Sequence, residues 1–204
     1  MTPHIRKLAL TVHITASVGW LGALGVFFAH ALATLVSEDQ QVARASSLAM
    51  GLTAWLVILP LSMATVVTGL VQALGTAWGL VRHYWVLFKL VLTAIATGVL
   101  LLKMGPITLL AEAASTAAFA RGDLLGLRQS LAFHAAGGLV VLLAALVLAV
   151  YKPAGLTVYG ARKQGETTPL GMPRWAKAFG VLLIVVSALV LVMALFGAHG
   201  PRVH

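Results

Sequence analysis

The chain contains no cysteine, and only 9% of its 204 residues are charged. The absence of cysteine excludes disulfides, thiolate metal sites and a cysteine nucleophile. Soluble domains carry about 25% charged residues, whereas this chain combines its low charge with 60% hydrophobic residues and a mean hydropathy of +1.00. These values exclude a water-soluble globular fold, because no such fold hides this much apolar surface.

Acidic residues are also scarce. The five that occur lie between the apolar segments, at Glu38, Asp39, Glu112, Asp123 and Glu166. Since no apolar segment holds a carboxylate, neither a carboxylate proton relay nor sodium-coupled transport is expected. The sequence also has no glycine-rich phosphate loop, no Gly-x-Ser-x-Gly turn and no His-Glu-x-x-His pair, so hydrolase chemistry of the soluble type has no support.

Long apolar runs dominate what is present. A membrane-crossing helix needs roughly 20 apolar residues, and five segments satisfy this requirement. They cover residues 8–36, 46–74, 86–104, 131–151 and 176–198. We therefore expect residues 1–204 to form one integral membrane domain, an all-α polytopic bundle of five transmembrane helices in a lipid bilayer. Pro60 predicts a kink in the second segment, Gly105-Pro106 the end of the third and Tyr151-Lys152-Pro153 the end of the fourth.

The distribution of basic residues predicts the orientation. The 14 lysines and arginines give a formal net charge of +9, and nine of them fall on the side that holds the N-terminus. Cytoplasmic loops carry the excess of lysine and arginine, so the N-terminus is expected in the cytoplasm. We expect a multi-pass protein of the bacterial inner (cytoplasmic) membrane. The positive charge is assigned to loops, and nucleic acid is not expected as a partner.

Two connections have distinctive compositions. Residues 105–130, expected outside the cell, contain an alanine-rich stretch from Ile107 to Arg121 that predicts a surface helix, broken at Gly122-Asp123. Residues 152–175, expected inside the cell, are basic and rich in glycine and proline. They are expected to form a solvated loop on anionic headgroups, with a partner-binding role as the alternative.

Two ionisable side chains lie inside apolar segments at a similar expected depth. His13 is near the start of the first segment, and Lys89 is near the start of the third. Ionisable groups inside a bilayer are costly, so a polar partner, a ligand or a water path is the default interpretation. We expect the two side chains to face each other across the bundle near the cytoplasmic surface, at a bound cofactor or metal. The alternative is that Lys89 extends its ammonium group to the headgroups, as is expected for Lys103.

A third ionisable residue, His134, opens the fourth segment and heads a stripe of mostly small residues. Such a stripe fits either close helix packing or room for a flat cofactor. His13 and His134 are expected near opposite membrane faces, separated by roughly 20 Å in depth at 1.5 Å per residue. They cannot ligate one iron, so they serve two sites or one of them is structural. The face of His13 also presents an aromatic wall, which consists of Trp20 and Phe27 at helical spacing.

The spacing His13-x6-Trp20-x-Gly22, followed by Trp85-x3-Lys89, resembles the signature of a bacterial membrane group. This group contains the copper-resistance D type proteins and the HemJ-type protoporphyrinogen oxidases. The resemblance covers about the first half of the chain. It implies a helix bundle that holds a b-type haem, with His13 as a haem ligand and Lys89 near a propionate or the substrate. The arginine that the oxidases carry shortly after the first-helix tryptophan is absent here.

Later motifs point to the same neighbourhood. The run His134-Ala-Ala-Gly-Gly and the run Tyr151-Lys152-Pro153-x-Gly155 resemble an uncharacterised bacterial integral membrane family. This similarity covers the fourth segment and its end.

Three functional hypotheses follow. The first is a membrane haem protein, a redox enzyme or an electron carrier with a membrane redox partner. In it His13 is an axial ligand, Trp20 lines the cofactor, Lys89 or Arg82 pairs with a propionate, and His134 belongs to a second cofactor site or is structural. The second is a non-catalytic scaffold or partner subunit whose polar residues only pack helices. The third is the handling of copper or another metal through His13 and His134, although the spans hold few methionines for a soft metal.

Overall fold

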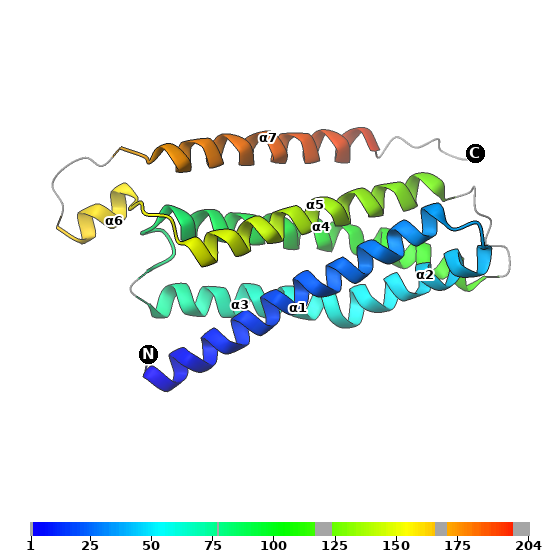
Figure 1. Cartoon of the computed structure of the whole chain (residues 1–204), viewed down its shortest axis with the longest axis horizontal. Helices are drawn as coiled ribbons and strands as arrows, with labels where there is room; N and C mark the ends of the chain where they lie inside the picture. Colours follow the sequence, from blue (N-terminus) through cyan, green and yellow to red (C-terminus); the bar gives the residue numbers. More distant parts are fainter. Residues whose placement is uncertain (1, 77, 117–123, 166–170, 198–204) are drawn as a thin grey trace.

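The computed structural model describes residues 2–76, 78–116, 124–165 and 171–197. The elements in chain order are α1 (Pro3–Val36), α2 (Gln40–Thr53), the π-helical turn η1 (Ala54–Ile58), α3 (Leu59–Gly75), α4 (Tyr84–Ser115), α5 (Leu125–Tyr151), α6 (Val158–Lys163) and α7 (Arg174–Gly197). The described residues form no β-strand, only an isolated bridge between His83 and Leu156. Figure 1 shows the long helices running roughly along one direction, with α7 at the upper edge. The predicted all-α fold is confirmed.

Four helical stretches in the described part of the chain are long and apolar enough to cross a membrane: Pro3–Val36, Gln40–Gly75, Tyr84–Ser115 and Leu125–Tyr151. A helix satisfies its backbone hydrogen bonds internally, as a segment surrounded by lipid requires. Only 22–28% of the most apolar window of each stretch is buried inside the protein. Most of these apolar side chains therefore face outward, which is the surface of a multi-pass membrane protein in a lipid bilayer.

The second of these stretches contains the π-helical turn η1 directly before Pro60. Proline has no N–H and its ring crowds the carbonyl one turn earlier, so the helix must widen or bend there. The irregularity predicted at Pro60 takes the form of this wide turn. The Ser62 hydroxyl donates to the carbonyl of Leu59 at 2.8 Å. The Trp55 indole in η1 donates to Thr108 of α4 at 3.0 Å, which ties the turn to a neighbouring helix.

Helix α4 continues through Gly105-Pro106 to Ser115, with Pro106 inside the helix. The predicted end of the third span at this proline is therefore wrong, as is the separate surface helix predicted to begin at Ile107. Burial explains the difference, because Ile107, Leu110 and Ala114 are at most 3% exposed and belong to the main core. The free energy gained by packing this face against α2 is larger than the cost of the hydrogen bond that Pro106 cannot make.

Arg44 of α2 holds the end of α4. Its Nε atom donates to the carbonyl of Ala114, and its Nη2 atom donates to that of Ser115 at 2.9 Å. A cation at the last carbonyls of a helix satisfies groups that have no partner within the helix. Glu112, predicted in a loop, lies exposed in the last turns of α4. Residues 117–123, which include Arg121 and the break predicted at Gly122-Asp123, lie outside the described residues.

Helix α5 begins at Leu125, several residues before the predicted start, and ends at Tyr151 as predicted. Its additional turns bring Arg128 into the bundle, where only 1% of this residue is exposed. The prediction that Arg128 lies in an external loop is wrong. Leu124 and Leu127, which precede Arg128 in the chain, pack against the core and hold this turn of the helix in the bundle.

The connection after α5 is folded onto the segment before α4. The N–H of Thr157 donates to the carbonyl of Arg82 at 2.9 Å, and the N–H of Tyr84 donates to that of Gly155 at 3.2 Å. Gly160 of α6 lies directly against the carbonyl oxygen of Arg82, so that a Cβ atom at this position would overlap it. The predicted solvated loop is therefore wrong for the described part, which is docked on the bundle. Residues 166–170 lie outside the described residues.

Candidate functional site

Two ionisable side chains meet inside the bundle, at the end that holds the N-terminus. His13 of α1 is 6% exposed, and its Nε2 atom lies 3.0 Å from Nζ of Lys89 on α4. Its Nδ1 atom lies 3.0 Å from Oγ1 of Thr68 on α3. The predicted juxtaposition of His13 and Lys89 is confirmed, and three helices meet at one imidazole. The ammonium group of Lys89 thus turns to His13 inside the bundle, which differs from the alternative of a group extended to the headgroups.

The donors that are available set the direction of these hydrogen bonds. The Thr68 hydroxyl donates to the carbonyl of Ala64 at 2.5 Å, and a hydroxyl has only one hydrogen to donate. Toward His13 the Thr68 oxygen therefore accepts, which places the imidazole proton on Nδ1. The Nε2 atom is then an acceptor for the Lys89 ammonium group. The result is a directed chain from Lys89 through His13 and Thr68 to the backbone of α3.

A haem iron at this site would bond to the same Nε2 atom, because the Nδ1 atom of His13 is already held by Thr68. The amine of Lys89 occupies that position, 3.0 Å from Nε2. Gly69 of α3 also abuts the ring, since a Cβ atom there would come within 3.2 Å of Cε1. In this arrangement the residues around His13 do not fit an iron porphyrin. Haem b at His13 stays a prediction from the sequence resemblance.

The metal hypothesis gains no ligand cluster in the part of the chain that the structure describes. Within it, no three side chains of histidine, aspartate or glutamate are grouped closely enough to hold a metal ion. The two predicted metal ligands have other partners: His13 contacts Lys89 and Thr68, and His134 bonds to Ser130 in its own helix. Copper or other metal binding through His13 and His134 stays a prediction.

An apolar cavity of about 180 Å³ lies farther along the bundle. It begins at Trp20 and Leu92, about one helical turn beyond Lys89. Helices α1, α4 and α5 line it, and Phe179 of α7 closes one side. Drug-sized ligands occupy pockets of about 300–1,000 Å³, so this cavity suits a single chain or ring. Val140 at its rim is 67% exposed, which shows that the cavity reaches the outer surface of the bundle.

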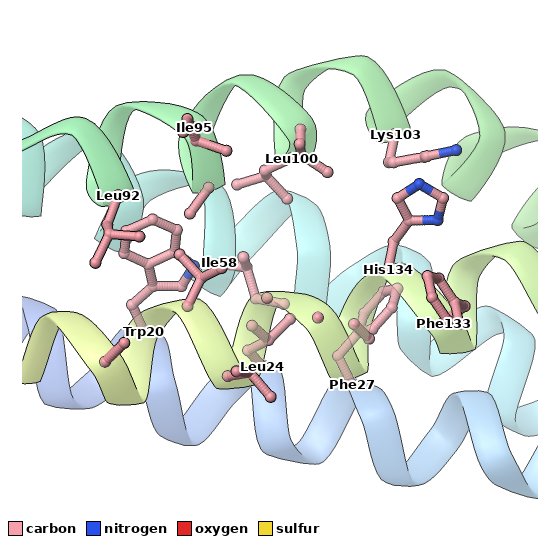
Figure 2. A pocket seen from close by; sticks show the side chains of 18 of the residues that line it. Trp20, Leu24, Phe27, Ile58, Leu92, Ile95, Leu100, Lys103, Phe133 and His134 are labelled. Carbon is pink, nitrogen blue, oxygen red and sulfur yellow. The ribbon is translucent and has the colours of Figure 1, made fainter. Parts of the chain in front are cut away.

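Two ionisable side chains, Lys103 of α4 and His134 of α5, lie at the far end of this cavity. Figure 2 shows the end of Lys103 next to the imidazole, with Trp20 and Leu92 at the other end of the view. The Nζ atom of Lys103 donates to Oγ of Ser130 at 3.3 Å, and Nδ1 of His134 donates to the carbonyl of Ser130 at 2.6 Å. A carbonyl can only accept, so Nδ1 carries the proton and Nε2 is left as an acceptor. Lys103 thus reaches across to α5 instead of extending to the headgroups as predicted.

The residues that the sequence predicted to bind a cofactor fall into separate places. His13 and Lys89 are in contact, whereas Trp20 is 2% exposed and lines the cavity. His134 lies at the far end of that cavity with Lys103. Arg82 lies before α4, where its backbone carbonyl accepts from Thr157 and its side chain packs on Gly79. The cofactor role of all five residues stays a prediction.

Some residues of these clusters were not found from the sequence. Thr68 and Ser130 carry no distinctive signal, because hydroxyl residues are common in membrane helices and often bond their own backbone. Lys103 had a signal, since it follows Lys89 by 14 residues, which is about four helical turns and the same helix face. Each lysine meets a histidine from a different helix, which the spacing alone did not predict.

Comparisons of the chain with protein-family models, with curated proteins and with solved structures find no match. The resemblance to the copper-resistance D and HemJ-type group therefore rests on residue spacing alone.

Proposed function

We propose that this multi-pass membrane protein binds a small membrane-soluble molecule in the cavity between α1, α4, α5 and α7. The bound molecule is apolar along its length and carries a carbonyl or carboxylate at one end. The supporting observation is the cavity of about 180 Å³, whose wall is apolar except at the end where Lys103 and His134 lie together. This proposal makes the protein a ligand-binding module and leaves open whether a reaction follows.

The charge of Lys103 favours a ligand with an accepting end. Its ammonium group has three N–H donors, and one of them is directed to Ser130. None of the described residues that line the cavity is acidic. A cation inside an apolar bundle is costly without an anion or an acceptor. A carboxylate or carbonyl of the ligand supplies that acceptor. If the ligand is a protonated carboxylic acid, its carbonyl accepts from Lys103 and its O–H donates to Nε2 of His134.

The proposal includes five spans and a cytoplasmic N-terminus in the bacterial inner membrane. Helix α7 has 24 residues, which at 1.5 Å per residue is about 36 Å and exceeds the roughly 30 Å of hydrocarbon. It packs on α4 through Phe179 and Phe88, whose ring centroids are 5.1 Å apart. The start of α1, the end of α5 and helix α6 lie at one end of the bundle. Nine of the 14 lysines and arginines are assigned to this side by the sequence, and such an excess favours the cytoplasmic side.

Filling the cavity tests this function. Gly137 lines the cavity, and a Cβ atom at this position would have no other atom within 4 Å. Because Gly137 is an exposed residue of the cavity wall, the new side chain in Gly137→Leu narrows the opening of the cavity without a backbone clash. We expect about tenfold weaker labelling by a photoreactive fatty acid, because overpacking a site costs about 1–3 kcal/mol. Labelling of the purified protein in detergent is quantified by mass spectrometry.

Gly98→Leu is the matched control for this experiment. Gly98 is an exposed glycine in α4 with open space around it, and it does not line the cavity. Its labelling should equal that of the wild-type protein. Equal labelling of Gly137→Leu and wild type would show that the cavity is not the binding site. Lys103→Met tests the polar end, because it should weaken labelling by the fatty acid more than labelling by the corresponding alcohol.

The haem prediction has its own measurement. We expect no Soret band in protein purified from haem-replete cells, because the Nε2 atom of His13 is held by Lys89. A Soret band that His13→Ala removes would support a membrane haem protein with a redox role and would show that Lys89 moves aside. Metal analysis of the same sample tests copper binding. The scaffold hypothesis predicts instead that Gly137→Leu and wild type behave alike in every binding assay.

A further inference from the structure

A second cavity, of about 510 Å³, lies at the end of the bundle that holds the N-terminus. Its wall contains Trp78 and Trp85, His83, Lys152 and the turn formed by residues 153–156. None of the described residues that line it also lines the first cavity. It is therefore a separate site, built where the segment before α4 meets the turn after α5.

Aromatic rings that contact one another form part of the wall of this cavity. The ring of Trp78 meets those of His83 and Trp85 edge to face, with centroids 5.0 Å and 5.4 Å away. The Nδ1 atom of His83 donates to the carbonyl of Trp78 at 3.0 Å, which leaves Nε2 for another partner. The Nζ atom of Lys152 lies 5.9 Å from the centre of the Trp78 ring. A cation, an imidazole and two indoles thus converge on one space.

The backbone of Lys152 is in an unusual conformation. Lys152 is the one non-glycine residue with a positive φ in the described chain, at φ 43° and ψ 57°. Glycine or asparagine ordinarily occupies this left-handed position after a helix. The following residue, Pro153, restricts Lys152 further. A non-glycine residue in a left-handed conformation that glycine adopts at lower cost indicates a function for its side chain. The side chain of Lys152 is a cation at the rim of the cavity.

We infer that this second cavity binds the phosphate of an anionic phospholipid. Lys152 supplies positive charge and N–H groups to the phosphate, while the rings of Trp78, Trp85 and His83 pack against the glycerol and the upper part of an acyl chain. Tryptophan is enriched at the level of the headgroups, and basic pockets at the ends of transmembrane helices bind anionic headgroups. None of the described residues that line the cavity is acidic, so no carboxylate opposes the phosphate. The inference is independent of the ligand proposed for the first cavity.

Lys152→Gly gives the sharpest test, because it removes the cation and also relieves the left-handed backbone. The full chain in detergent is titrated with dioctanoyl phosphatidylglycerol and, separately, with dioctanoyl phosphatidylcholine. Binding is followed by native mass spectrometry and by tryptophan fluorescence. Wild type should bind the anionic lipid at least about fivefold more tightly than the zwitterionic one, and Lys152→Gly should lose this preference. Its thermal midpoint without lipid should equal or exceed that of wild type.

Two variants complete the experiment. Lys152→Asn also tolerates the left-handed backbone and should lose the preference in the same way. Lys163→Gln is the matched control, because Lys163 is an exposed lysine of α6 that does not line the cavity, and the preference should survive. Retained preference in Lys152→Gly and Lys152→Asn would overturn the site. Equal loss in Lys163→Gln, or competition by inorganic phosphate at the concentration of the lipid, would show diffuse charge or a free-anion site instead.

Discussion

Replacing His13 by leucine is expected to destabilise the bundle by about 2 kcal/mol. The change removes the one described hydrogen-bond acceptor of the Lys89 ammonium group and the donor to Thr68. Breaking a fully buried pair by removing one partner costs about 3–5 kcal/mol, and because Lys89 is only half-buried, the expected cost falls below this range. Thermal and denaturant unfolding in detergent, followed by helical circular dichroism, measures the loss.

A double variant separates this explanation from a simple packing defect. Lys89→Met alone should cost about 1–2 kcal/mol, because the Nε2 acceptor of His13 is then buried without a donor. In His13→Leu/Lys89→Met both polar partners are gone, and an apolar pair of similar size should restore most of the stability. Additive losses in the double variant would show that the two side chains do not depend on each other. An intact binding cavity in the double variant would assign the pair a structural role.

Gly160→Ala is expected to lower stability by about 2 kcal/mol, although helix propensity alone predicts a gain. Alanine is favoured over glycine in a helix by about 1 kcal/mol, and Gly160 lies in α6. A Cβ atom there would overlap the backbone carbonyl oxygen of Arg82, and a backbone atom cannot rotate away as a side chain can. We therefore expect α6 to separate from the segment before α4. Trypsin cleavage after Arg162 and Lys163 should become faster.

Gly171→Ala is the control for this prediction. Gly171 precedes α7, is exposed, and has no atom within 4 Å of a Cβ at its position. Its substitution should change neither the unfolding midpoint nor the cleavage rate. A Gly160→Ala protein as stable as wild type and as resistant to trypsin would show that the connection after α5 is not docked on Arg82. Such a result would also remove the wall of the lipid cavity that this turn provides.

Much of the fold could be predicted because length and composition decide it. A run of apolar residues long enough to span hydrocarbon must form a helix, since no other single segment satisfies its own backbone in lipid. The proline signals were less reliable. Pro60 follows the wide turn η1, and Pro153 follows the end of α5, whereas Pro106 lies inside α4. The difference is tertiary, because the helix beyond Pro106 is held by its buried face and by Arg44.

Charge was a weaker guide to position than hydropathy. Arg128 was predicted in the connection 105–130 and Lys103 at the headgroups, yet Arg128 is 1% exposed and Lys103 contacts Ser130 of α5. A long cationic side chain bends toward whatever polar group the neighbouring helix presents. The identity of that group depends on how each helix is rotated about its own axis. The number of charged residues in a segment gives no information about this rotation.

The sequence by itself determined that this chain is a bundle of membrane-crossing helices, and it placed His13 and Lys89 at one depth on two of them. Only the tertiary structure decided that the two side chains touch, that Thr68 directs the imidazole, and that the cavity ends at Lys103 and His134. The physical reason is that these helices are apolar on all sides. Their residue pattern therefore does not specify the rotation of each helix about its own axis, and that rotation selects the partners.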